Sequence, residues 1–308
     1  MRTRELRIGT RGSQLALYQA NWVKEKLIQA DPRLPVVLTR IKTTGDKIQD
    51  APLAKIGGKG LFVKEIEEAL IERKIDLAVH SIKDVPTELP EGLHLSAITK
   101  REDPRDAFIS RDGTRLKDLP QGAKIGTSSL RRQAQLLYLR GDFEMIPLRG
   151  NLDTRLKKLG TINLDGIVLA LAGVKRLGLE ERITEIIPMA ISLPAIGQGA
   201  LGIETRRGDK EVEDKIQFLN DPDSWNAVSA ERGFLKKLEG GCQVPIAAFA
   251  YIEGMTLFIE GLVGTVDGKR LIRDKLEGPL DKAESIGIQL AETLLEAGAK
   301  EILDEIYK

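Results

Sequence analysis

The sequence contains one cysteine, Cys242, whose thiol could take part in covalent chemistry. It lies in residues 240–246 (GGCQVPI), between a predicted helix and a predicted strand. A single thiol cannot close an internal disulfide or build a thiolate metal cluster, so it could be core filler, a thiolate catalyst or a covalent attachment point. A protease-type nucleophile needs a histidine and an orienting partner. Covalent attachment needs only a thiol that reacts once.

Proton chemistry falls to carboxylates, because the chain has only two histidines, His80 and His94. His80 lies within a predicted strand, which favours a packed, hydrogen-bonded side chain over a catalytic one. Asp84 is the best-placed carboxylate, since in residues 79–86 (VHSIKDVP) it follows the strand, beside Lys83 and before a proline. Its alternative role is to cap the turn.

Arginines occur where helices are predicted to begin. In residues 126–133 (GTSSLRRQ) a strand ends, hydroxyl groups offer an N-cap, and Arg131 and Arg132 fall in the first helical turn. A cation there is unfavourable by some tenths to about 1 kcal/mol. An anion close to these arginines is therefore expected.

The same pattern recurs after two other predicted strands, with Arg11 in residues 10–13 (TRGS) and Arg149 and Arg155 in residues 149–155 (RGNLDTR). In the first of these, Ser13 could cap the helix that follows. Strand-to-helix junctions at the carboxyl ends of parallel strands face the ligand crevice in open α/β sheets. Solvated surface arginines are the alternative for any one junction. Three such junctions favour an anion site.

The anion is better described as several carboxylates than as a phosphate. Residues 57–60 (GGKG) lack the spacing and hydroxyl residue of a P-loop, and no strand is followed by a GxGxxG pattern. Arginine pairs bidentately with carboxylates. The polar connection over residues 47–56 and the glycines after it predict a mobile lid carrying Lys55 and Lys59, with a plain surface loop as the alternative.

Alternating strands and helices predict a parallel, wound α/β architecture. Strands are expected at 6–9, 36–41 and 75–82 in a first lobe and at 124–126, 144–148 and 166–172 in a second. The charged residues 100–106 are interpreted as a hinge. Residues 194–202 are interpreted as a second crossing, after which a strand at 200–204 could return to the first sheet.

The character of the chain changes after about residue 217. A helix at 225–238 is followed by strands at 244–252, 255–263 and 270–277, the last two joined by a turn containing Asp267 and Gly268. A helix at 281–297 completes a small α+β domain with a three-stranded antiparallel sheet. The predicted domains are residues 1–99 with 200–217, residues 100–199, and residues 218–308.

Composition excludes several classes of protein. The 308 residues are 42% hydrophobic and 30% charged with a net charge of +1, which suits a globular protein and argues against a nucleic-acid coat. The start of the sequence has no signal-peptide pattern, and no run approaches the ~18 apolar residues of a membrane span. A cytoplasmic monomer without a metal site is expected.

Four motifs together closely resemble the hydroxymethylbilane synthase, or porphobilinogen deaminase, family. They are residues 79–86 (VHSIKDVP), 126–133 (GTSSLRRQ), 193–199 (LPAIGQG) and 239–245 (EGGCQVP). They are long, specific and in order, and the resemblance spans essentially the whole chain. It implies two lobes like those of periplasmic solute-binding proteins, crossed twice by the chain, and a third domain.

The resemblance implies an enzyme of tetrapyrrole biosynthesis. It would condense four porphobilinogen molecules head to tail, release ammonia at each addition, and free the linear tetrapyrrole by hydrolysis. It also implies a dipyrromethane cofactor, joined by a thioether to the cysteine matching Cys242, from which the product grows. Each pyrrole bears an acetate and a propionate, which accounts for the carboxylates that the arginines require.

The resemblance also implies roles for individual residues. Asp84 would be the catalytic carboxylate, which helps to protonate the leaving amine and stabilises cationic azafulvene and pyrrole intermediates. The residues matching cofactor ligands are Lys83, Asp84, Ser129, Arg131, Arg132 and Arg155, and those matching the substrate region are Arg11, Ser13, Gln19, Phe62, Arg149, Arg155 and Arg176. Phe62 matches an aromatic that stacks near the incoming pyrrole, although by sequence alone it could be core.

The sequence departs little from the family pattern. Gly9 and Gln14 stand where the family commonly has alanine and proline. Gln14 makes the start of the helix less rigid, which weakens the placement of Ser13 but removes no charged ligand.

Two other classes of function are compatible with parts of the sequence. A two-lobed carboxylate-binding protein without chemistry would explain the lobes and the arginines but would not need a third domain carrying Cys242. A cysteine-dependent hydrolase is disfavoured by the contexts of the two histidines. The mass of the unfolded chain distinguishes these classes, because a thioether-linked dipyrrole survives denaturation.

Overall fold

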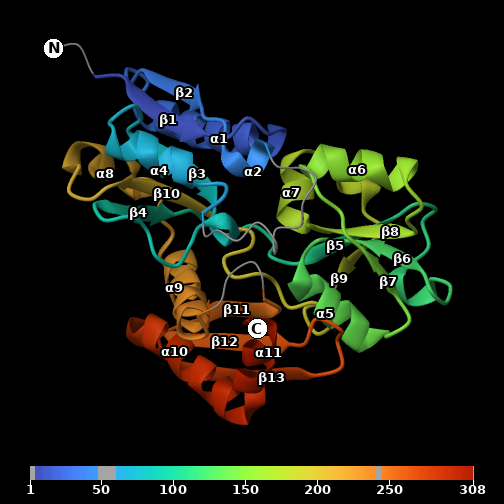
Figure 1. The fold of residues 1–308 in the computed structure, drawn as a ribbon. Coiled ribbons are helices and arrows are strands. Elements are labelled where there is room, and N and C mark those ends of the chain that lie inside the picture. The colour runs from blue at the N-terminus through green and yellow to red at the C-terminus, as the bar shows by residue number, and fades with distance from the viewer. Residues whose placement is uncertain (1–3, 48–59, 240–243, 308) are drawn as a thin grey trace. The chain divides into compact units, whose positions relative to one another are not determined.

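The computed structural model describes residues 4–47, 60–239 and 244–307. They form two compact units (Figure 1). Unit 1 comprises described residues 4–47, 60–102 and 200–225, and unit 2 comprises 103–199, 226–239 and 244–307. The division into three domains stays a prediction.

Unit 1 is built on a five-stranded sheet with the strand order β2-β1-β3-β10-β4. Its strands are β1 Leu6–Thr10, β2 Val36–Arg40, β3 Leu77–Ser81, β4 Leu93–Ile98 and β10 Leu201–Arg206. The first three are parallel, whereas β10 runs antiparallel to both β3 and β4. The predicted return of the chain to the first sheet is therefore confirmed, but the sheet is mixed, not purely parallel.

Helices cover both faces of this sheet. The helices are α1 Gln14–Ala30, α2 Thr44–Lys47, α4 Lys64–Ile71 and α8 Lys210–Ile216, with single 3₁₀ turns η1 Ile82–Asp84 and η4 Gln217–Leu219. Successive residues of a strand face opposite sides, so Leu77 and Val79 of β3 pack in the cluster of α1, and Ala78 packs in the cluster of α4.

Helix α1 packs against the sheet through one face. It buries Gln19, Ala20, Val23 and Leu27, and Ala20, Val23 and Leu27 join the apolar cluster of the sheet. Tyr18 is 45% exposed.

Unit 2 begins with a second five-stranded sheet, ordered β7-β6-β8-β5-β9. The strands are β5 Asp106–Ser110, β6 Lys124–Gly126, β7 Glu144–Ile146, β8 Gly166–Ala170 and β9 Glu185–Ile187; the helices are α5 Leu130–Leu139, α6 Leu152–Thr161 and α7 Leu171–Arg176, with 3₁₀ turns η2 Leu116–Asp118 and η3 Glu180–Arg182. Strands β6, β7 and β8 are parallel, and β5 is antiparallel to β8. This antiparallel pairing sets Asp106 beside Ala170, at the carboxyl end of β8.

The C-terminal part of unit 2 is a three-stranded antiparallel sheet, as predicted. It consists of β11 Ile246–Glu253, β12 Thr256–Gly264 and β13 Leu271–Pro279, with α9 Pro222–Lys237, α10 Ala283–Leu294 and α11 Lys300–Tyr307, the turn η5 Leu280–Lys282 and the π-helical η6 Leu295–Ala299. The helix predicted at 281–297 is followed by a break at Gly298, whose φ of 103° is left-handed, and by the unpredicted α11.

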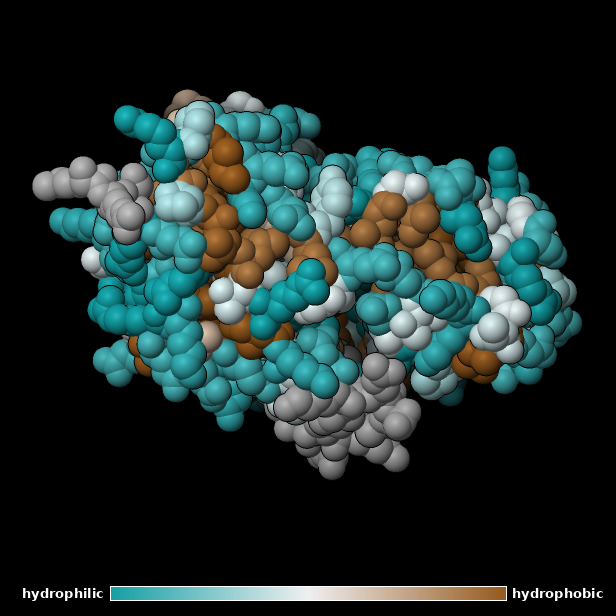
Figure 2. Space-filling model, turned by 90° about the horizontal axis from the view of Figure 1, so that it is seen from above, coloured by the Kyte–Doolittle hydropathy of each residue, from teal (hydrophilic) through white to brown (hydrophobic). Residues whose placement is uncertain are grey.

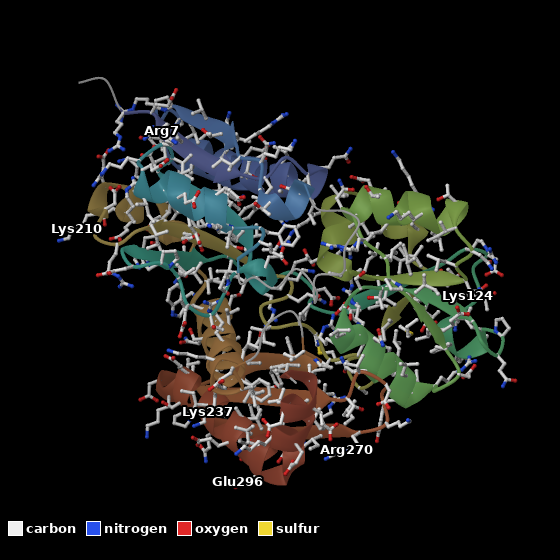
Figure 3. All side chains as sticks on the ribbon, viewed as in Figure 1. Arg7, Lys124, Lys210, Lys237, Arg270 and Glu296 are labelled. Atoms are coloured by element: carbon white, nitrogen blue, oxygen red, sulfur yellow. The ribbon has the colours of Figure 1, made fainter. Side chains whose placement is uncertain are left out.

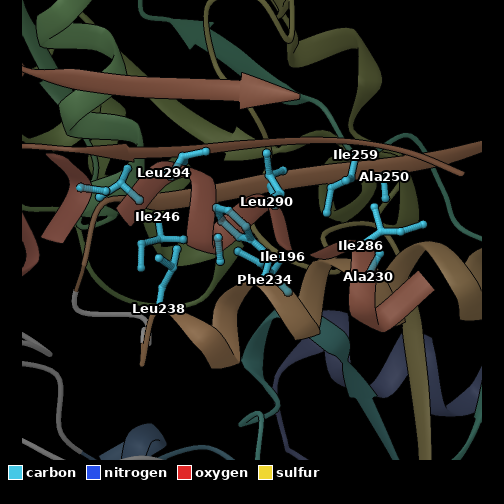
Figure 4. Close-up of a cluster of buried hydrophobic side chains, with 14 of the residues drawn as sticks. Ile196, Ala230, Phe234, Leu238, Ile246, Ala250, Ile259, Ile286, Leu290 and Leu294 are labelled. Carbon is cyan, nitrogen blue, oxygen red and sulfur yellow. The ribbon is translucent and has the colours of Figure 1, made fainter. Parts of the chain in front are cut away.

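A large apolar core holds this part together. Phe234 of α9 and Leu290 of α10 are almost completely buried against the sheet (Figure 4). Gly287 allows the close approach of α10 to α9, since a Cβ there would lie 1.9 Å from the carbonyl oxygen of Ala230. The two helices therefore cover one face of the sheet in close contact.

The face drawn in Figure 2 is mostly hydrophilic, with hydrophobic residues showing between polar ones. Charged side chains are spread along the chain, as the labelled Arg7, Lys124 and Lys237 illustrate (Figure 3). Within the described ranges, no helix is long and apolar enough to cross a membrane. The same residues contain no group of three or more histidine, aspartate or glutamate side chains that could hold a metal ion.

Candidate functional site

The candidate catalytic carboxylate of unit 1 lies at the carboxyl end of β3. Asp84 is half-buried in the η1 turn beside Lys83, which is also half-buried. Among the described residues, Asp84 has no hydrogen-bond or ion-pair partner. Its carboxylate therefore keeps its acceptor capacity for a ligand.

The η1 turn is anchored to β10 by its first residue. The backbone N–H of Ile82 donates to the carbonyl oxygen of Ala200 at 3.1 Å. The Ile82 side chain is buried and fits over Gly202, where a Cβ would lie 2.4 Å from the Ile82 Cδ1 atom. The strand that returns from the second sheet thus seats the turn that carries Asp84.

Arg11 follows β1 at the same edge of the sheet, because β1 and β3 are parallel. Its guanidinium donates from Nε and Nη2 to Asp46 and lies 4.2 Å from the ring centroid of Phe62. Burial would raise the pKa of Asp46, but the hydrogen bonds and charge of Arg11, together with Thr43, leave that pKa below its usual range. Gly45 leaves room for the Phe62 ring, since a Cβ at this position would lie 2.3 Å from a ring carbon.

Ser13 and Gln19 have structural partners. The Ser13 hydroxyl caps α1 by accepting a hydrogen bond from the Ala16 N–H at 3.2 Å, as the sequence predicted. Gln19 is buried, and its amide nitrogen donates to the Ser81 hydroxyl at 2.9 Å. Gln19 therefore connects α1 to the end of β3.

Three titratable side chains lie buried between α4 and the sheet. His80 Nε2 is 2.9 Å from Glu204 Oε2, and both residues are buried, so the prediction that His80 is packed and hydrogen-bonded is confirmed. Glu67 of α4 is 7% exposed. Its Oε1 atom and that of Glu204 have no hydrogen-bond partner in the described chain. Burial, and next the charge of Glu204, raises the pKa of Glu67 to about 7.

This raised pKa predicts that Glu67→Gln changes the pH dependence of stability. The ordinary value for glutamate is 4.5, so between about pH 4.5 and 7 the folded protein holds a proton that the unfolded chain has lost. Stability from this group is complete below pH 4.5 and is lost as pH rises through 7. Relative to wild type, Glu67→Gln should gain about 1 to 3 kcal/mol of unfolding free energy between pH 5 and 8. Urea denaturation across this range measures the gain.

Glu68→Gln is the matched control, because Glu68 is the next residue of α4 and is exposed. Its unfolding free energy should follow that of wild type with pH. Parallel curves for Glu67→Gln and wild type would contradict the assignment of the buried proton to Glu67.

In unit 2 the arginines of α5 are buried, not solvated. Ser129 caps the helix by accepting from the Arg132 N–H. Both guanidinium groups bind Asp106: Arg131 Nη1 donates at 2.9 Å and Arg132 Nη2 at 2.7 Å. Each arginine is 5% exposed, and Asp106 is completely buried. The anion expected at this helix start is therefore, in part, a residue of the chain itself.

The two arginines favour the charged form of Asp106. Burial would raise its pKa, but the charges of Arg131 and Arg132 and their hydrogen bonds outweigh burial and hold the pKa far below the usual range. Two guanidinium groups and one carboxylate leave one positive charge in excess. The Nε atom of each arginine has no hydrogen-bond partner within the described ranges, so this cluster suits a further anion.

Three more predicted arginines belong to unit 2. Arg149 follows the β7 segment and has a buried Nη1 atom without a hydrogen-bond partner in the described residues. Arg155 of α6 donates from Nε to the carbonyl oxygen of Gly150 at 2.9 Å. Arg176, at the end of α7, donates from Nη2 to the carbonyl oxygen of Gly199 at 2.7 Å.

The predicted residues that the structure describes fall in two sets, one in each unit. The unit 1 set is Arg11, Ser13, Gln19, Phe62, Lys83 and Asp84, and the unit 2 set is Ser129, Arg131, Arg132, Arg149, Arg155 and Arg176. Lys55, Lys59 and Cys242 lie outside the described residues.

Sequence reasoning missed Asp46, Asp106 and Glu67. Each lies next to a predicted residue only in space: Asp46 is 35 residues from Arg11, and Asp106 is 25 from Arg131. The one signal for Asp106 is its place in the charged stretch at residues 100–106, the predicted hinge. No signal identifies Glu67.

Comparison with known proteins assigns the chain to one family. Residues 6–214 match the family described as "Porphobilinogen deaminase, dipyromethane cofactor binding domain", and residues 225–296 match "Porphobilinogen deaminase, C-terminal domain". The chain is 58% identical over 308 residues to the porphobilinogen deaminase of Geobacter metallireducens, covering all of this chain and 96% of that one. It is 57% identical to that of Pelobacter propionicus, covering all of this chain and 99% of that one.

A comparison with solved structures finds a similarity to the periplasmic aliphatic sulphonate binding protein SsuA of Escherichia coli. That similarity covers 76% of this chain and 70% of SsuA at 13% identity, with a TM-score of 0.42. Two family models in sequence order, and relatives at 57 and 58% identity over the whole chain, establish the relationship. The chain belongs to the porphobilinogen deaminase family.

Proposed function

We propose that Asp84 is the catalytic carboxylate of this enzyme and that the arginines of unit 2 hold the carboxylates of its cofactor. The family membership makes the chain a hydroxymethylbilane synthase, a transferase of tetrapyrrole biosynthesis with a dipyrromethane cofactor. The observation that carries the proposal is a carboxylate without a partner among the described residues at the end of β3. This negatively charged group in unit 1 contrasts with the excess of positively charged arginines at the strand ends of unit 2.

The side chains of unit 2 fit a ligand with several carboxylates. The cluster of Arg131, Arg132 and Asp106 has one excess positive charge, and buried N–H groups of Arg131, Arg132 and Arg149 have no partner in the described chain. Buried donors without partners are costly, by about 1 to 3 kcal/mol each, and a carboxylate would satisfy them. The proposed cofactor ligands are Lys83, Asp84, Ser129, Arg131, Arg132 and Arg155. When bound, the dipyrromethane supplies the pyrrole to which the first substrate is joined.

Asp84 is suited to a reaction in which positive charge develops. Porphobilinogen must lose its amino group as ammonia, and the substrate carbon left behind is cationic. A carboxylate held by the anchored η1 turn can direct a proton to the leaving amine and then stabilise that cation. Lys83 lies next to it in the same turn.

We assign the substrate region to Arg11, Ser13, Gln19, Phe62, Arg149, Arg155 and Arg176. Arg11 is supported by its geometry, because Asp46 and the Phe62 ring hold its guanidinium. A fixed guanidinium binds a carboxylate with little further loss of side-chain entropy. Cys242 as the attachment point, a lid with Lys55 and Lys59, a cytoplasmic location and a monomeric state belong to the same proposal and rest on the sequence.

Arg11→Leu tests the substrate site. Loss of a charge-assisted hydrogen bond costs about 1.5 to 3 kcal/mol, so kcat/KM for porphobilinogen should fall by about 10- to 150-fold. Arg11→Lys should recover only part of the loss, because an ammonium group cannot reproduce the bidentate geometry. Steady-state rates of product formation over a range of porphobilinogen concentrations measure both effects.

Arg33→Leu is the control, because the side chain of Arg33 is 92% exposed. It should keep the wild-type kcat/KM. Equal values for Arg11→Leu and Arg33→Leu would remove Arg11 from the substrate site.

A further inference from the structure

Asp106 accepts hydrogen bonds from four side chains. Besides Arg131 and Arg132, it binds the hydroxyl of Ser192 and the amide nitrogen of Gln198, each at 2.9 Å. Arg131 donates to both carboxylate oxygens, the longer contact being 3.3 Å from Nη2. A carboxylate has about four lone-pair sites, so these donors fully occupy Asp106 and fix its orientation.

Two of these contacts come from the segment 192–199, whose LPAIGQG motif includes none of the proposed catalytic, cofactor or substrate residues. Its Leu193 carbonyl accepts from Arg131 Nη1 at 2.6 Å and from Gln135 at 3.1 Å. The Gln135 side chain in turn accepts from the Leu193 N–H at 2.7 Å. Arg131 is thus held both by the Asp106 carboxylate and by the motif's backbone.

The motif is itself firmly anchored in unit 2. The N–H of Gly197 donates at 2.6 Å to Glu231 of α9, a completely buried carboxylate that also accepts from the N–H of Ala250 in β11. The Gly199 carbonyl accepts from Arg176. The segment therefore cannot shift without breaking contacts to α9 and to two of the proposed ligand-binding arginines.

We propose that Asp106 and Gln198 are positioning residues, which hold the guanidinium groups of Arg131 and Arg132 ready for the carboxylates of the cofactor. The inference rests on the proposed role of these two arginines. Asp106 neutralises one of their two charges, and Gln198 fixes the carboxylate that does so. The Nε donors of the two arginines, which have no partner in the described chain, are then already oriented before the cofactor binds. Binding therefore requires little reorganisation.

The test is the rate at which cofactor-free protein acquires covalent mass when porphobilinogen is added. Cofactor-free protein is produced in cells unable to make porphobilinogen, and intact mass is followed after denaturation. Asp106→Asn should slow the gain of mass by about tenfold or more. Removing this carboxylate leaves the buried charges of Arg131 and Arg132 without a counter-charge. Gln198→Met keeps the size of the side chain and the Asp106 charge, and should slow the gain by about threefold.

Asp142→Asn is the matched control. Asp142 binds Arg140 through Nε at 3.0 Å and Nη2 at 2.7 Å, at the C-terminal end of the same helix α5. This variant should acquire mass at the wild-type rate. Circular dichroism of each cofactor-free variant identifies any that do not fold, and Gln198→Met then carries the test.

A double-mutant cycle separates positioning from a general structural role. Cofactor loading is the gain of covalent mass by cofactor-free protein. If Asp106 acts through Arg132, then Asp106→Asn should slow loading much less in the Arg132→Gln background than in wild type. Fully additive effects, or wild-type loading by both Asp106→Asn and Gln198→Met, would overturn the inference. Wild-type loading by Arg132→Gln alone would instead refute the proposed cofactor site on which the inference rests.

Discussion

Asp84→Asn is expected to reduce kcat by about 10²- to 10⁴-fold, the usual range for a positioned acid-base or electrostatic group. Asparagine keeps the shape of the side chain and the η1 turn but removes the negative charge. The turn is held by Ile82, through its bond to Ala200 and its fit over Gly202, so the variant should fold normally. KM should change little, because the charge matters most where positive charge develops.

The measurement is ammonia release and product formation in single-turnover and steady-state experiments. The variant should still assemble at least some cofactor, which intact mass will show. Glu88→Gln is the control, since Glu88 is an exposed carboxylate four residues further along the same connection. A near-normal rate for Asp84→Asn would remove this carboxylate from the mechanism.

Cys242→Ser is expected to abolish the covalent cofactor mass entirely. A serine hydroxyl is a far weaker nucleophile than a thiol, which at neutral pH is partly thiolate, and the chain has no second cysteine to replace it. The unfolding midpoint of the cofactor-free variant should match that of cofactor-free wild type. Activity should be lost with the mass, because product growth begins on the cofactor.

Gln243→Ala keeps the thiol and alters its neighbour, so it should carry the same added mass as wild type. Intact mass under denaturing conditions, before and after incubation with porphobilinogen, distinguishes the two variants. Recovery of the added mass by Cys242→Ser would place the attachment elsewhere in the chain.

The sequence was informative where function depends on neighbours along the chain. Ser13 and Ser129 precede helical patterns, so their capping roles could be predicted and are confirmed. The position of Asp84 after a strand was predictable for the same reason. The resemblance of four motifs to one family then supplied the chemistry, which local patterns alone left open between catalysis and binding.

Contacts between residues that are far apart in the sequence could not be predicted from neighbours along the chain. Arg131 and Arg132 indicated a missing anion, but its identity as Asp106 depends on the antiparallel pairing of β5 with β8. The raised pKa of Glu67 likewise depends on its burial in the fold and on the charge of Glu204, 137 residues away in sequence. The pKa values of Asp106 and Glu67 are set by burial and by charges that are near in space but far away in sequence. No pattern of neighbouring residues predicts such a contact.

The position of β10 has a consequence for how the protein folds during synthesis. This strand lies between β3 and β4, yet it follows them by more than 100 residues in the chain. Until it emerges from the ribosome, β3 and β4 each have an open edge, and the η1 turn has no Ala200 carbonyl to bind. Such long-range pairing slows folding. The turn bearing Asp84 is therefore completed only after the arginines of the second sheet have been made.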